Sequence, residues 1–165
     1  MHPLTKPVTV LSAALFLGSL ATVVPASASQ TADVQTVTAT YDCGSYGTTD
    51  LTIHASAASG VGSVKISTSA GLAPVDIPAN SITATLRLAR AAGGTVSFSG
   101  TANDAAAAGR PVVIGALTGS VAAGDSLDSY IPAAGSGDAS LSLNILGTAN
   151  TCVAVSKQSP GPIVF

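Results

Sequence analysis

The chain of 165 residues carries six Lys and Arg residues against eight Asp and no Glu, which gives a formal charge of −2 at pH 7. The basic residues form no cluster and Trp is absent, so the cationic face and stacking aromatics that bind nucleic acids are missing. Glu is absent and Gln, Lys and Met are rare, although these residues favour exposed helix faces. Thr, Val, Ser and Gly replace them, which favours strands and turns.

The first 28 residues have the pattern of a signal peptide. Lys6 is the only charge before a mostly apolar run over residues 8–24, Pro25 ends the run, and the small residues Ala26-Ser27-Ala28 follow. A retained membrane anchor is the alternative, but the run is short for a span that needs about 20 apolar residues. We expect cleavage after Ala28, no remaining membrane span, and a secreted, extracellular protein.

The first half of the mature chain shows alternating apolar and polar residues. We expect strands over residues 34–41, 51–56 and 64–67, because one side of each is apolar and the other polar. Residues 71–78 contain two prolines, which cannot donate to a sheet ladder. This segment is therefore expected to be an edge strand or a crossover.

The second half begins with residues 82–88, which form the clearest amphipathic strand of the sequence. The pair Asn103-Asp104 precedes four alanines and could cap one helical turn. The stretch from Gly124 to Gly137 is the longest irregular one. Further strands are expected over residues 96–99, 112–121, 141–145, 153–155 and 163–165.

These eight to ten short strands with almost no helix predict an all-β fold. One polar and one apolar face per strand fits two sheets packed face to face. The sequence therefore predicts an antiparallel two-sheet sandwich that forms a single domain over residues 29–165.

Four segments resemble a known group of proteins. Thr40-Tyr41-Asp42-Cys43 follows the leader, Asn150-Thr151-Cys152 precedes the last segments, and SITATLRLARAAGGTVSFSGT and RPVVIGALTGSV lie between them. The arrangement resembles small secreted actinobacterial β-sandwich proteins whose function is not established. The resemblance implies an immunoglobulin-like sandwich with a terminal disulfide, and it implies no catalytic residues.

Cys43 and Cys152 are the only cysteines of the chain. In a secreted protein, such a pair near the two ends of the domain predicts a structural disulfide. It would close a loop of about 110 residues and contribute about 4 to 5 kcal/mol of stability. A redox or metal pair is the alternative, disfavoured because there is no C-x-x-C motif and His54 is the only mature histidine. No cofactor is predicted.

Catalytic constellations are missing from the sequence. No catalytic motif surrounds His54, and the sequence contains no G-x-S-x-G. A glycosidase needs two carboxylates that flank one sugar, whereas the Asp residues of this chain are scattered along the sequence. We therefore predict no catalytic residues and a protein that is not an enzyme.

Two groups of residues are candidates for ligand binding. Asp125, Asp128 and Asp138 could supply oxygen ligands to Ca²⁺, although ordinary turn chemistry is the simpler explanation. Tyr46 and Tyr130 lie in irregular segments and could bind carbohydrate, although packing at strand ends is the commoner role of Tyr.

The expected function is that of a non-catalytic binding or structural module of the extracellular space or cell envelope, with a cell-surface polymer or a protein as its partner. The alternative is a small secreted inhibitor of an extracellular hydrolase, which would act through residues 124–137. Both cysteines lie at the ends of the domain instead of bracing that stretch, which disfavours the alternative.

Overall fold

The computed structural model describes residues 33–165, so the predicted signal peptide lies outside the described residues. This part of the chain contains ten strands, one short 3-10 turn and no α-helix, which confirms the all-β prediction. The 3-10 turn is η1 (Gly44–Tyr46). The strands are β1 (Gln35–Asp42), β2 (Thr48–Ala58), β3 (Val61–Leu72), β4 (Ile82–Arg90), β5 (Thr95–Thr101), β6 (Pro111–Ser120), β7 (Ser126–Ser129), β8 (Leu141–Ile145), β9 (Thr148–Ala154) and β10 (Ile163–Val164).

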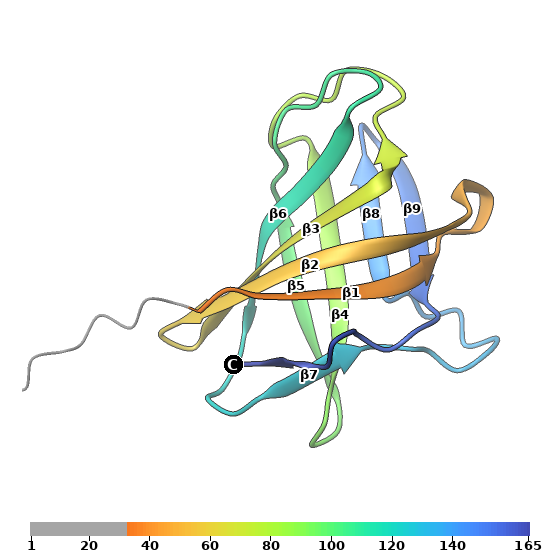
Figure 1. Cartoon of the computed structure of the whole chain (residues 1–165). Helices are drawn as coiled ribbons and strands as arrows, with labels where there is room; N and C mark the ends of the chain where they lie inside the picture. Colours follow the sequence, from red (N-terminus) through yellow and green to blue (C-terminus); the bar gives the residue numbers. More distant parts are fainter. Residues whose placement is uncertain (1–32) are drawn as a thin grey trace, which may run out of the picture.

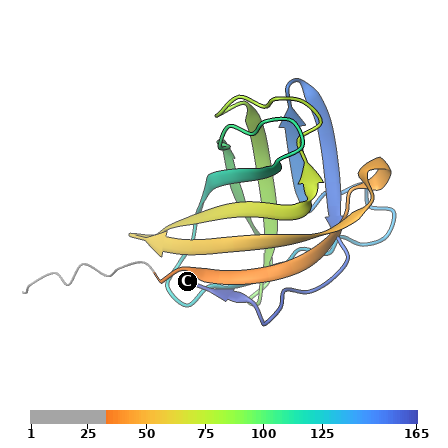
Figure 2. The ribbon, with the colours of Figure 1, turned by 45° about the horizontal axis from the view of Figure 1, so that its top comes forward.

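Eight of these strands form a closed antiparallel barrel. Their order is β4-β5-β6-β3-β2-β1-β9-β8, and β8 returns to pair with β4. Strands β1, β2 and β3 curve across one side of the barrel, while β4, β8 and β9 form the other side (Figures 1 and 2). The predicted immunoglobulin-like two-sheet sandwich is therefore wrong, because one sheet closes on itself.

The sandwich prediction failed because alternation looks the same in a sandwich and in a barrel. In β4 the inward residues Ile82, Leu86 and Leu88 are all buried, as the sequence pattern predicts. What makes the barrel is the pairing of both strand edges. One edge of β4 pairs with β5, and the other pairs first with β8 and then with β7. No feature of a single strand encodes that choice of partner.

One end of the barrel is closed by a packed core. Phe98 and Leu117 are fully buried, and the ring of Phe165 lies 6.0 Å from that of Phe98 between centroids. Strand β7 pairs with the last residues of β4, and β10 pairs with β7. These two short strands lie across the lower end of the barrel in Figure 1 and contribute the buried Leu127 and Ile163.

Strands β3 and β6 lose their regular register towards the other end. Gly115 and Ala116 of β6 oppose the single Lys65 of β3. Gly115 has a φ of 118°, and a Cβ atom there would lie 2.5 Å from a backbone oxygen of β3, so only glycine fits. Further along, residues 68–71 of β3 oppose Val112 alone. Because bulges bend a strand and increase its twist, this end of the barrel departs from a regular cylinder.

Two smaller expectations are also corrected. Asn103 caps no helix; its side-chain oxygen accepts hydrogen bonds from the backbone N–H groups of Ser81 (2.7 Å) and Ile82 (2.9 Å) and so fixes the start of β4. The stretch from Gly124 to Gly137 is not irregular throughout, because it contains β7 with its buried Leu127.

Cys43 and Cys152 form a disulfide with their Cα atoms 4.0 Å apart, which confirms the predicted bond. Cys43 directly follows β1, and Cys152 lies in β9. These two strands are paired over only two residue pairs. The disulfide therefore joins β1 and β9 at their short seam in the barrel. The sequence had suggested a link between the two ends of a sandwich instead.

Candidate functional site

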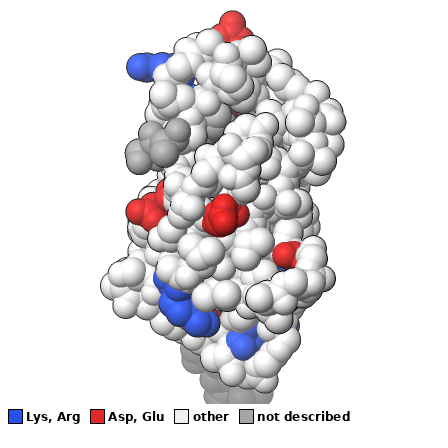
Figure 3. Space-filling view, turned by 90° about the vertical axis from the view of Figure 1, so that its right-hand side faces the viewer, with Lys and Arg blue, Asp and Glu red and all other residues white. Residues whose placement is uncertain are grey.

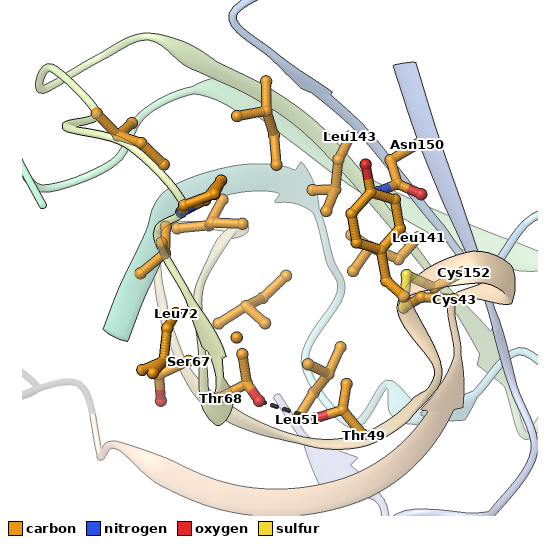
Figure 4. A pocket seen from close by; sticks show the side chains of 18 of the residues that line it. Cys43, Thr49, Leu51, Ser67, Thr68, Leu72, Leu141, Leu143, Asn150 and Cys152 are labelled. Carbon is orange, nitrogen blue, oxygen red and sulfur yellow. Dashed lines mark hydrogen bonds between the residues drawn. A yellow bond between two sulfur atoms is a disulfide. The ribbon is translucent and has the colours of Figure 1, made fainter. Parts of the chain in front are cut away.

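A cavity of about 410 Å³ lies in the end of the barrel that is remote from β7 and β10. Along β4, residues 82–86 pair with β8 beside the cavity, whereas residues 88–90 pair with β7 at the packed end. The wall comes from β2, β3, β6, β8 and β9 together with the disulfide (Figure 4). Its apolar members include Leu51, Ile66, Ile114, Leu141, Leu143 and Ile145. The volume falls within the range of small-molecule sites.

Strand β8 shows how the barrel interior changes from packed to hollow. Leu141, Leu143 and Ile145 lie on the inward face of this strand and all line the cavity. Leu141 is buried, whereas Leu143 and Ile145 are only half-buried. Protein interiors are normally filled without large voids. Accessible apolar side chains on an inward face therefore indicate a binding space rather than a core.

Exposed apolar side chains contribute to the same cavity from three separate segments. Tyr46 of η1 is 71% exposed, and Leu72, Val75 and Leu146 are each 52% exposed. Leu72 ends β3, Val75 follows in the connection to β4, and Leu146 lies in the turn between β8 and β9. They surround the cavity with apolar surface that is open to solvent, and we call these four residues the entrance residues.

The turn that carries Leu146 has an unusual residue choice. Ile145 and Thr148 are paired, so Leu146 and Gly147 form a two-residue turn, and both have positive φ angles, 51° and 87°. Such turns favour Asn or Asp before Gly, because these residues tolerate the left-handed conformation better than Leu does. A leucine held here at a conformational cost supports a role for its side chain at the entrance.

The few polar side chains of the cavity differ in their hydrogen bonding. On the β2–β3 side, the hydroxyl groups of Thr49 and Thr68 are hydrogen-bonded at 2.8 Å. Across the cavity, Asn150 of β9 lies beside the disulfide (Figure 4). Within the described residues, no hydrogen bond reaches the side-chain amide of Asn150. This amide is therefore available to a bound molecule.

Charged groups avoid the cavity. Within residues 33–165, no Asp, Lys, Arg or His lines it. Asp42 and Asp76 lie next to lining residues in the sequence, but their carboxylates accept hydrogen bonds from the N–H groups of Gly44 (2.9 Å) and Ala108 (2.8 Å) and so stabilise turns. The side of the molecule in Figure 3 carries only scattered acidic and basic groups on a mostly uncharged surface.

The structure separates the two tyrosines that the sequence singled out. Tyr46 is an entrance residue, whereas Tyr130 does not line the cavity. The guanidinium carbon of Arg87 lies 4.3 Å from the centroid of the Tyr130 ring, and the Tyr130 hydroxyl donates a hydrogen bond of 2.8 Å to Asp138. This hydrogen bond raises the pKa of Tyr130. Tyr130, which was considered for carbohydrate binding, therefore makes structural contacts with Arg87 and Asp138.

Each of the three aspartates considered for Ca²⁺ forms an ion pair with a different basic side chain. The ion pairs are Asp125–Arg90 (3.3 Å), Asp128–Lys157 (3.2 Å) and Asp138–Arg87 (3.5 Å). The N–H of Ala122 and the Arg90 guanidinium also lower the pKa of Asp125. In the described part of the chain, no three or more His, Cys or Asp side chains form a group that could hold a metal ion. The structure does not bring these three carboxylates together.

The other titratable side chains of interest, His54 and Tyr41, make contacts that stabilise the fold. His54 lies on the outward face of β2, where its Nδ1 atom shares a hydrogen bond of 2.9 Å with the Thr36 hydroxyl. Tyr41 is fully buried in the core, and this burial raises its pKa to about 12. The nearby Ser129 hydroxyl lowers this pKa slightly, and the Asp128 carboxylate raises it slightly further. Neither environment provides the nucleophile and base of a catalytic site.

Sequence reasoning missed the cavity itself, although Tyr46 and the two cysteines, which it singled out for other reasons, line it. Leu143 and Ile145 read as ordinary core positions of a strand, because alternation does not reveal whether the space they face is filled. A usable signal lay in Leu72, Val75 and Leu146, which are apolar residues at strand ends and in turns, where polar residues are usual.

Comparison of the chain with protein-family models, curated proteins and solved structures finds no match. The resemblance to small secreted actinobacterial proteins stays a prediction, and the immunoglobulin-like fold that it implies is wrong. Among residues 33–165, no helix has the length and apolar character needed to cross a membrane.

Proposed function

We propose that this protein binds a small apolar molecule in the open end of its barrel. The observation that carries the proposal is the cavity of about 410 Å³, with its apolar wall and its exposed entrance residues. Eight-stranded barrels are wide enough to hold one small ligand. Among the described residues, no Asp, Lys, Arg or His side chain lines the wall, which supports binding without catalysis.

The expected affinity for a generic probe is modest. An aromatic molecule that buries about 200 Å² of apolar surface gains about 5 kcal/mol from the hydrophobic effect. Lost translational and rotational freedom offsets part of this gain. A free energy of about 5 kcal/mol corresponds to a Kd of about 0.2 mM, so we expect a Kd in the millimolar range for an unselected probe and a lower value for the physiological ligand.

The proposal is tested with N-phenyl-1-naphthylamine, an uncharged dye whose fluorescence rises in apolar surroundings. The wild-type protein should bind one dye molecule, and the fluorescence should reach a plateau as the dye is titrated. In the variant Leu143→Trp, the larger side chain occupies the cavity, so binding should fall at least about tenfold, a loss of about 1.4 kcal/mol.

A matched control places the same residue on the other face of the same strand. Ser142 is exposed and points away from the barrel interior, so Ser142→Trp should bind the dye as the wild type does. The chain has no other Trp, so the tryptophan fluorescence of each variant reports whether the new side chain is buried. Equal dye binding by both variants, or none by the wild type, would refute the proposal.

We also propose that the protein acts outside the cytoplasm. The leader pattern supports this, and a disulfide is compatible with an oxidising compartment. The proposal keeps the predicted role of a non-catalytic binding module, but with a small molecule in place of the polymer or protein first expected. The inhibitor alternative gains no support, since the stretch that would act is partly built into the sheet through β7.

A further inference from the structure

We infer that the cavity selects an uncharged amphiphile, namely an apolar molecule with a single hydrogen-bonding group that pairs with Asn150. This inference rests on the proposed function and adds to it the chemical class of the ligand. It follows from two independent features of the wall, which are the placement of charge and the placement of Asn150.

The wall offers no compensation for a charged ligand. No cationic, acidic or imidazole side chain of the described residues lines the cavity. All three ion pairs of this part of the chain involve residues that do not line it. A charge transferred from water into such surroundings loses its hydration and gains no partner. A carboxylate or ammonium group buried in the cavity would therefore oppose binding.

Asn150 is placed among apolar neighbours on the inward face of β9. It pairs directly with Leu143 of β8, so the two side chains lie on the same face of the sheet. Cys152 follows two residues later and is also in the wall. Asn150 is half-buried, and a ligand in the cavity would remove part of the water around its amide. An amide that loses water without gaining a partner weakens binding, so the favoured ligand brings a donor or an acceptor.

On the opposite wall, the hydroxyl groups of Thr49 and Thr68 are bonded to each other at 2.8 Å, and the hydroxyl of Ser67 is the other polar group that β3 contributes. Leu51 and Ile66 provide apolar surface beside them. The ligand is therefore expected to place its polar group at Asn150, near the disulfide, and its apolar body against β2, β3 and β8 (Figure 4).

Three probes of similar shape test this inference by displacement of N-phenyl-1-naphthylamine at pH 7. Naphthalene has no polar group, 2-naphthol has one uncharged hydroxyl, and 2-naphthoate carries a charge. We expect 2-naphthol to bind roughly three- to tenfold more tightly than naphthalene, the value of one neutral hydrogen bond. We expect 2-naphthoate to bind at least about tenfold more weakly than 2-naphthol, and to gain affinity as acidification protonates it.

The variant Asn150→Leu should abolish the advantage of 2-naphthol over naphthalene and leave naphthalene binding intact. Thr151→Leu, which changes the next residue on the outward face of β9, should preserve that advantage. Binding of 2-naphthoate as tight as that of 2-naphthol, or an unchanged ratio in Asn150→Leu, would overturn the inference while the proposed function stands. Failure of both naphthalene and 2-naphthol to displace the dye would overturn both.

Discussion

The disulfide gives the most quantitative prediction about stability. It joins residues separated by 109 positions and fastens the seam between β1 and β9, which has only two residue pairs of its own. For a loop of this length, the chain-entropy relation predicts a stabilisation of about 4.8 kcal/mol at 25 °C. We predict that the double variant Cys43→Ala/Cys152→Ala loses about this amount of unfolding free energy. Alanine is chosen because Cys152 is buried and a serine hydroxyl there would need a partner.

Urea unfolding, followed by far-ultraviolet circular dichroism, measures this loss. Wild-type protein unfolded under reducing conditions is the control, since it lacks the bond but keeps both sulfur atoms. The reduced protein and the double variant should agree within about 1 kcal/mol, because the lost atoms leave only a small space. A loss below about 2 kcal/mol in both samples would show that other contacts hold the seam and would refute the reasoning.

Three further predictions concern packing and ionisation. Leu86→Ala removes a fully buried side chain and should lose about 2 to 5 kcal/mol of unfolding free energy. Leu143→Ala, whose side chain lines the cavity, should lose only about 1 kcal/mol. Equal losses in urea unfolding would contradict the presence of a cavity at this end of the barrel. Gly119→Ala places a Cβ atom 2.6 Å from a backbone oxygen of β5 and should cost about 1 to 3 kcal/mol by the same assay; an unchanged midpoint would argue against this close approach. The pKa of Tyr41 is about 12 in the folded protein and about 10 in the unfolded chain, so the unfolded chain releases this proton at lower pH. About 3 kcal/mol of stability that is present below pH 10 should therefore be lost as the pH rises from 10 to 12. Tyr41→Phe should remove this dependence in urea unfolding at several pH values, and the exposed Tyr46→Phe should keep it; an unaltered dependence in Tyr41→Phe would assign it to another group.

The local structure of this chain could be predicted well from its sequence. Residues 82–88 alternate as expected and form most of β4, and the pairing of Cys43 with Cys152 is confirmed. Both features depend on neighbours in sequence or on simple counting. Alternation reports burial of one face, and two cysteines allow only one intramolecular pair.

The closure of the barrel and the cavity could not be predicted, for a common physical reason. Both depend on which distant strands pair and in what register. The pairing of β8 with β4 closes the barrel, and residues 68–71 facing Val112 disturb its regular form beside the cavity. Each is a property of two strands together. Leu143 therefore had the pattern of a core residue, although its side chain faces a space that is not filled.

The central claim is that the open end of the barrel binds an apolar molecule, and methyl-labelled NMR spectroscopy with naphthalene tests it most directly. The methyl signals of Ile66, Leu143 and Ile145, which line the cavity, should shift progressively and saturate together. The signals of Leu88 and Leu127, which lie at the packed end of the barrel, should stay in place. Absence of any saturable shift, or shifts that occur at Leu88 and Leu127 but not at the cavity wall, would contradict the account.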